Sequence, residues 1–265
     1  MPDQAPSQGK LSQLLAEWPK GAVAVQSWFD EREIPRQLAD RYCRFGWLRR
    51  IGRGAYARLH ETVEWTGGLY ALQQQLGLPL HAGGKTALEL QGYAHYLPMR
   101  AGGVKWLFGP PKAKPPRWFL KRDWGDRPRC MATNLFQSSP GLALTKKKIE
   151  DYEIRLSAPE RAILELLDQL PESQGFEEAQ QLMESLATLR PELVQQLLEN
   201  CRSIKAKRLF LLLAEICGHQ WLSALKLDVV ELGKGKRLLV KGGHFDRKFQ
   251  ISTPYQRHDK EHIPA

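Results

Sequence analysis

Apolar residues recur at helical spacing near the start of the chain. Four of them lie three or four positions apart: Leu11, Leu14, Leu15 and Trp18. This spacing predicts a first helix that ends at Pro19, because proline lacks the N–H that an interior helical position needs. The pattern then predicts a second short helix over 25–33, which the dipeptide Ile34-Pro35 interrupts.

A third helix is predicted from Pro35 to about Phe45, with Gly46 in the position of a C-terminal cap. Leu38, Tyr42 and Phe45 follow the spacing i, i+4, i+7, so we expect them to face the core. The opposite face carries polar residues: Arg36, Gln37, Asp40, Arg41 and Arg44.

Directly after this helix, the stretch W-L-R-R-I-G-R-G-A-Y-A-R predicts a small hairpin. Gly52-Arg53-Gly54 has the composition of a tight turn, and apolar residues flank it on both sides. The stretch carries four arginines and no acidic residue: Arg49, Arg50, Arg53 and Arg58.

The remainder of the chain mixes both kinds of element. We expect helices over 69–76, 86–96, 176–189, 193–198 and 204–216, and another that begins near Pro159. We expect strands over 105–108, 117–121, 129–136, 237–240 and 248–252. The sequence therefore predicts an α+β fold: an N-terminal winged helix-turn-helix domain with trailing helices over 1–98, and a mixed α/β C-terminal domain over 99–265.

The charge pattern favours an anionic partner. The formal net charge is +10, and eight arginines from Arg32 to Arg58 stand against only Glu33 and Asp40. No apolar run approaches the roughly 18 residues that a membrane span needs, so we expect no membrane partner. The four cysteines show no C-x-x-C spacing, which favours free thiols and a cytoplasmic location.

Three short helices followed by an arginine-bearing hairpin is the order of a winged helix-turn-helix that binds double-stranded DNA. We expect Arg36 and Gln37 to read base edges in the major groove, and Arg41 and Arg44 to contact phosphates. In the hairpin, Arg53 at the tip is the candidate for a minor groove. The remaining hairpin candidates for backbone contact are Arg49, Arg50 and Arg58. Protein docking and simple solubility remain alternatives, and Asp40 on the same face counts against DNA.

A second basic segment interleaves cations with the aromatic residues Trp118, Phe119 and Trp124. Its basic residues are Lys112, Lys114, Arg117, Lys121 and Arg122. Cations beside aromatic rings can form a platform for nucleic-acid bases, whereas a charged edge strand is the alternative.

No catalytic or cofactor motif emerges, so we predict no enzyme activity, no cofactor and no metal. Gly83-Gly84-Lys85-Thr86 lacks the glycine spacing of a Walker A motif. Glu160 is explained as an acidic residue in the first turn of a helix. The remaining candidate metal ligands lie in a polar tail: His258, Asp259, Glu261 and His262.

Three stretches, in order, resemble the AbiEi-type antitoxins of bacterial type IV toxin–antitoxin systems. They are the helix-turn-helix and hairpin from Val23 to Tyr56, the segment G-G-K-T-A-L-E-L-Q-G-Y from Gly83 to Tyr93, and L-S-A-P-E-R-A-I-L-E from Leu156 to Glu165. The proline-rich loop from Gly109 to Pro116 has no counterpart in this pattern.

The resemblance implies a DNA-binding domain that represses its own operon at inverted repeats, with a homodimer on DNA as one arrangement. It also implies a C-terminal domain that antagonises a cognate nucleotidyltransferase-type toxin, without a need for direct contact. Two alternatives remain open: a nucleic-acid-processing enzyme with its active site in the C-terminal domain, and a protein-interaction module that docks through the winged helix.

Overall fold

The computed structural model describes residues 8–94, 102–136, 138–172, 175–240 and 242–254, and it is a mixed α+β fold as predicted. Two compact units share the chain in alternating segments. The first comprises Met1–Ala82, Met99–Ala132 and Lys146–Leu156. The second comprises Gly83–Pro98, Thr133–Thr145 and Ser157–Ala265. The single domain boundary expected near residue 98 stays a prediction.

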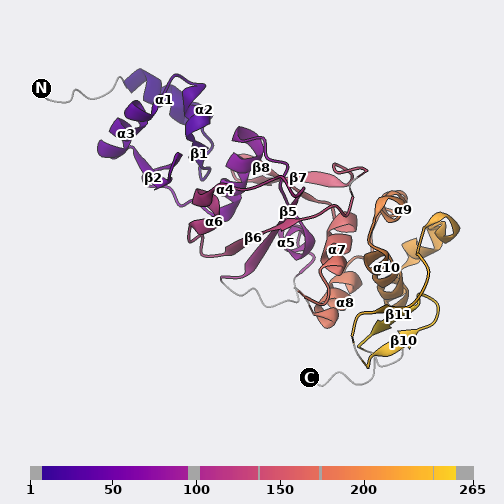
Figure 1. Cartoon of the computed structure of the whole chain (residues 1–265). Helices are drawn as coiled ribbons and strands as arrows, with labels where there is room; N and C mark the ends of the chain where they lie inside the picture. Colours follow the sequence, from indigo (N-terminus) through magenta and orange to yellow (C-terminus); the bar gives the residue numbers. More distant parts are fainter. Residues whose placement is uncertain (1–7, 95–101, 137, 173–174, 241, 255–265) are drawn as a thin grey trace, which may run out of the picture. The chain divides into compact units, whose positions relative to one another are not determined.

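The first unit begins with the predicted three helices and hairpin (Figure 1). These elements are α1 (Gln8–Glu17), β1 (Ala24–Val25), α2 (Gln26–Asp30), α3 (Arg36–Arg44), β2 (Leu48–Gly52) and β3 (Ala55–Arg58). The three strands form one sheet in the order β1-β3-β2. Buried aromatic rings fill the space between helices and sheet, since the Phe29 ring lies 5.6 Å from Trp18 and stacks 5.0 Å from Tyr56.

The rest of the first unit surrounds a five-stranded sheet with the order β6-β5-β4-β8-β7. Its strands are β4 (His81–Ala82), β5 (Val104–Gly109), β6 (Arg127–Ala132), β7 (Leu144–Ile149) and β8 (Tyr152–Ser157). Its helical elements are α4 (Trp65–Tyr70), the π-helical turn η1 (Ala71–Gln75) and α6 (Arg117–Lys121). The strands β5 and β6 run parallel, whereas β4 pairs antiparallel with β5.

In this unit one sequence prediction is wrong, and one pair of strands was not predicted. Residues 117–121, expected as a strand, form the helix α6. Trp118 and Phe119 are both buried, and consecutive side chains of a strand would point to opposite faces. The hairpin of β7 and β8 was not expected, because a lysine run hides β7, although Tyr152, Ile154 and Leu156 alternate as a half-buried strand requires.

The second unit is mainly helical. Its helices are α5 (Gly84–Leu90), α7 (Pro159–Asp168), α8 (Phe176–Glu184), α9 (Pro191–Asn200) and α10 (Ile204–Cys217), followed by the 3-10 turns η2 (Gln220–Ala224) and η3 (Leu227–Val229). A small sheet has the order β10-β11-β9, formed by β9 (Arg237–Leu238), β10 (His244–Asp246) and β11 (Ile251–Thr253). The helix expected over 86–96 ends at Leu90, where the Gln91 amide donates back to the Ala87 carbonyl and Gly92 adopts a φ of 86°.

Candidate nucleic-acid interface

The turn before α3 determines where this helix begins. Glu33 adopts a left-handed conformation with φ 56°, which lets the Ile34 N–H donate to the Phe29 carbonyl at 2.9 Å. The Ile34 side chain is buried, and Pro35 follows in an extended conformation as the N-cap. The helix therefore starts at Arg36, one residue later than predicted.

The inner face of α3 is formed by Ala39 and Tyr42, which are fully buried. Leu38 is half-buried, so the expected core face is only partly confirmed. Phe45, which we expected in the core, is 38% exposed and stacks on Trp47 with ring centroids 5.9 Å apart. The helix ends at Arg44, so Phe45 no longer follows the helical spacing.

The outer face of α3 is basic. Arg36, Gln37 and Arg44 are exposed, and Arg41 is half-buried. Arg36 and Gln37 belong to the first turn, and neither side chain makes a hydrogen bond or ion pair with the part of the chain that the structure describes. These two side chains are therefore available to a ligand at the N-terminal end of the helix.

Asp40 on this face is not a bare negative charge, because it forms an ion pair with Arg50 of β2. The Arg50 guanidinium also lies 5.8 Å from the Tyr56 ring centroid. The pair joins the third helix to the hairpin and neutralises the acidic residue that counted against DNA binding. It also occupies Arg50, which we expected to contact the backbone.

The hairpin is held by hydrogen bonds to Gln26 of α2. The Gln26 N–H donates to the Gly54 carbonyl at 2.9 Å, and the Tyr56 hydroxyl donates to Gln26 Oε1 at 2.9 Å. Gly54 has a φ of 72°, which permits a tight turn. Arg53 is exposed at this tip, without a hydrogen bond or ion pair to any described residue.

The side chains of two hairpin arginines donate hydrogen bonds to backbone carbonyls of their own domain. Arg58 donates to the Leu15 carbonyl at 2.6 Å and to the Trp18 carbonyl, and its guanidinium lies 5.7 Å from the Trp18 ring centroid. Arg49 donates to the Glu61 carbonyl at 2.9 Å. The alternation of strand side chains could have revealed this for Arg58, since it shares a face of β3 with the buried Tyr56.

The proposed aromatic platform in the second basic segment is wrong. Trp118, Phe119 and Trp124 are buried and pack on one another, so their faces are closed to nucleic-acid bases. The basic residues have different positions: Arg122 is half-buried, and the other four are exposed, namely Lys112, Lys114, Arg117 and Lys121.

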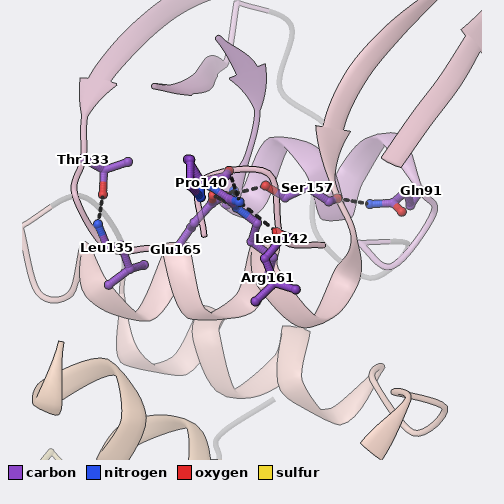
Figure 2. Close-up of polar contacts among 9 residues, drawn as sticks. Gln91, Thr133, Leu135, Pro140, Leu142, Ser157, Arg161 and Glu165 are labelled. Carbon is purple, nitrogen blue, oxygen red and sulfur yellow. Dashed lines mark hydrogen bonds and ion pairs between the residues drawn. The ribbon is translucent and has the colours of Figure 1, made fainter. Parts of the chain in front are cut away.

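The motif around Pro159 forms a buried polar cluster in the second unit (Figure 2). The Glu165 carboxylate accepts from Arg161 Nε at 2.7 Å, from Ser157 Oγ at 2.8 Å and from the Gly84 N–H at 3.1 Å. Arg161 Nη1 donates to the carbonyls of Pro140 and Leu142, both at 2.8 Å. The cluster joins three segments that are distant in sequence, at Gly84, at 140–142 and at 157–165, so we assign it a structural role.

Glu160 also has a partner that the sequence did not reveal. Its carboxylate binds Arg190 through both oxygens, at 2.9 Å and 3.0 Å. Burial raises the pKa of Glu160, but the hydrogen bonds from Arg190 and from the backbone outweigh it, so the pKa lies below the usual value. Glu160 therefore anchors the start of α9 rather than serving only the dipole of α7.

Lys85, in the segment weighed as a phosphate loop, is paired with Glu178 and Glu89. Across the described residues, no group of three or more candidate ligands could hold a metal ion. The candidate ligands from His258 to His262 lie outside the residues that the structure describes. Within the same limits, the structure has no helix with the length and apolar character of a membrane span.

Three helices, a three-stranded sheet and an arginine-tipped hairpin define a winged helix-turn-helix regulator. A family model described as the AbiEi antitoxin N-terminal domain of a transcriptional regulator matches residues 7–99. A second, described as a transcriptional regulator and AbiEi antitoxin of a type IV toxin–antitoxin system, matches residues 103–254. The chain belongs to the AbiEi antitoxin family of transcriptional regulators, which confirms the resemblance.

Other comparisons add the fold. The crystal structure of the RV2827C protein from Mycobacterium tuberculosis superposes with a TM-score of 0.62 at 14% identity, over 91% of this chain and 88% of that chain. At this identity the likeness concerns the fold alone. No curated protein matches the chain.

Proposed function

We propose that this AbiEi regulator represses its own operon by placing α3 in the major groove of operator DNA. The observation that supports this most directly is the exposed polar face of α3, with Arg36 and Gln37 in its first turn and Arg44 at its end. At about 1.5 Å per residue, the nine residues of α3 extend over about 13 Å, comparable to the major groove width of about 12 Å.

In this arrangement some residues contact base edges and others contact the DNA backbone. Arg36 and Gln37 read base edges, because side chains near the N-terminal end of a recognition helix reach furthest into the groove. Arg41 and Arg44 contact phosphates, which fix the position of the helix. Arg53 enters the minor groove beside the site, and Arg49, Arg50 and Arg58 serve the domain itself through their internal contacts.

Two copies of the chain on inverted repeats fit this mode of binding. A helix-turn-helix dimer contacts half-sites about one helical turn apart, or a multiple of it, and the symmetry of the operator mirrors that of the protein. The antitoxin part of the function, antagonism of a nucleotidyltransferase-type toxin by the C-terminal part, is supported by family membership.

The test of DNA binding is an electrophoretic shift of the chain's own upstream region. Arg36→Ala with Arg44→Ala should abolish the shift, while thermal unfolding stays unchanged because both side chains are exposed. Arg237→Ala with Arg247→Ala, which removes two exposed arginines of the second unit, is the matched control. Equal affinity of the Arg36/Arg44 variant and the wild type would refute the assigned recognition helix.

The toxin part is tested in cells. Expression of the neighbouring toxin gene should arrest growth, and co-expression of this chain should restore it. If the Arg36→Ala/Arg44→Ala variant still restores growth when both genes are driven from a foreign promoter, antagonism is separate from repression, as we propose. Failure of the wild-type chain to restore growth would contradict the antitoxin assignment.

A further inference from the structure

Helix α6 lies against β2 of the hairpin, beside the turn. A Cβ atom on Gly52 of β2 would lie 2.5 Å from Trp118 Cβ, so this approach is possible only for glycine. On another side, a Cβ on Gly68 of α4 would lie 2.7 Å from Trp124 and 2.9 Å from Phe119. Figure 1 shows α6 beside α4. The helix is therefore fixed between the hairpin and α4.

Trp118 and Phe119 of α6 form one buried aromatic cluster with Trp124. Trp118 and Phe119 meet edge to face at 5.8 Å, and Phe119 and Trp124 lie 5.5 Å apart. The Trp124 indole N–H donates to the Phe119 carbonyl at 2.8 Å. Because these rings point inward, the cationic residues next to them in sequence are displayed on the outside.

Arg117 and Lys121 are exposed and one helical turn apart, and Lys112 and Lys114 are exposed in the loop that leads into α6. None of the four makes a hydrogen bond or ion pair within the described part of the chain. The nearby acidic residue Asp123 accepts a hydrogen bond from the Gly125 N–H at 2.9 Å, in its own turn. This surface thus carries the four cations against one exposed carboxylate, that of Asp123, and its net charge is positive.

Arg122 adds a second sign of an anion site. Its Nε is buried and finds no hydrogen-bond partner among the described residues. Burial lowers the pKa of Arg122, and the neighbouring guanidinium of Arg49 in β2 lowers it further, against a smaller opposite effect of the Asp123 carboxylate. An anion that binds between or beside Arg122 and Arg49 would reduce the repulsion between these two guanidinium groups.

We infer that α6 and its preceding loop form a second phosphate-binding element, continuous with the hairpin, that grips the backbone of the duplex flanking the operator half-site. We call it the α6 surface, formed by Lys112, Lys114, Arg117, Lys121 and Arg122. This inference rests on the proposed function. The ligand is double-stranded DNA, because a single-strand site needs exposed rings for stacking and these rings are buried.

The experiment measures affinity by fluorescence anisotropy at several salt concentrations, with the full-length chain. The probes are a duplex of its own upstream region, a scrambled duplex of equal length and a single strand of that length. The test variant replaces Lys112, Lys114, Arg117 and Lys121 by Gln. The matched control replaces four exposed lysines elsewhere by Gln: Lys146, Lys148, Lys234 and Lys236.

The wild type should bind both duplexes, and the test variant should lose affinity for both by a similar factor. Each lost phosphate contact reduces the slope of log K against log salt by about 0.9, so we expect a reduction of about 2 to 4. The control should keep the wild-type slope. Circular dichroism should show that both variants are folded.

The inference would be overturned by an unchanged slope in the test variant, by an equal loss in the control, or by a preference of the wild type for the single strand. A loss confined to the upstream duplex would also overturn it, because it would indicate base readout. If the wild type binds neither duplex, the proposed function itself fails, and that result is separate from the others.

Discussion

Arginine has opposite roles in two regions of this molecule. In the winged helix-turn-helix, Arg36 and Arg53 are exposed and make no hydrogen bond with the described residues. In the second unit, Arg208 is buried and donates to four backbone carbonyls, and Arg161 is buried against Glu165. A basic composition therefore cannot by itself identify a DNA surface, because the same side chain is exposed to solvent in one region and joins loops in the other.

The difference follows from the cost of removing a charge from water. A buried guanidinium needs partners for its donors, so its surroundings are built around it. An exposed guanidinium stays hydrated and contributes little to the free energy of folding, so it can bind a ligand without loss of stability. Variants that affect stability and variants that affect DNA binding should thus fall into separate groups.

The largest effect is expected for Glu165→Ala in the buried cluster. Glu165 is fully buried, and its loss leaves the Arg161 charge without its carboxylate and the Ser157 hydroxyl without its acceptor. We expect unfolding free energy to fall by about 3–5 kcal/mol, measured by urea denaturation. Glu192→Ala, at an exposed first-turn carboxylate, should change it by less than about 0.5 kcal/mol. Equal effects of the two variants would contradict a structural role for the cluster.

A smaller effect, with a distinct pH dependence, is expected for Arg190→Gln. The pKa of Glu160 is depressed in the folded chain, so its ionisation stabilises the fold above the unfolded pKa of about 4.3, and this stabilisation is lost as pH falls through the folded pKa. Because Arg190 is 62% exposed, we expect a loss of only about 1–2 kcal/mol at neutral pH.

The difference between wild type and Arg190→Gln should shrink as the pH is lowered below both pKa values of Glu160. Urea denaturation from neutral to acid pH measures this. Arg202→Gln, which removes an exposed arginine of the same unit, is the comparison variant. A gap that stays constant over the whole pH range would show that Arg190 acts through packing rather than through the carboxylate.

The sequence predicted the elements that depend on local pattern. The three helices and the hairpin followed from apolar spacing, from Pro19 and Pro35, and from the Gly52-Arg53-Gly54 turn. Their order, together with the segments around Gly83 and Pro159, was enough to indicate the AbiEi family.

The partners of individual charges could not be predicted, because they come from distant parts of the chain. The carbonyls that accept from Arg58 lie 43 residues earlier at Leu15 in α1 and 40 residues earlier at Trp18, directly after α1. Glu160 finds Arg190 thirty residues later. Helix α6 was mistaken for a strand because aromatic residues favour strands, and only the tertiary contacts with Gly52 and Gly68 reveal why both rings are buried.

We propose that α3 reads base edges in the major groove while Arg53 of the hairpin enters the minor groove beside it. The most direct test measures affinity for a set of operator duplexes in which each base pair is substituted in turn. Arg36→Ala should cost about 1–3 kcal/mol and remove the discrimination at one or two adjacent base pairs. Arg53→Ala should weaken binding to all duplexes of the set by a similar factor. A base-preference profile of Arg36→Ala that equals the wild-type profile would contradict the account.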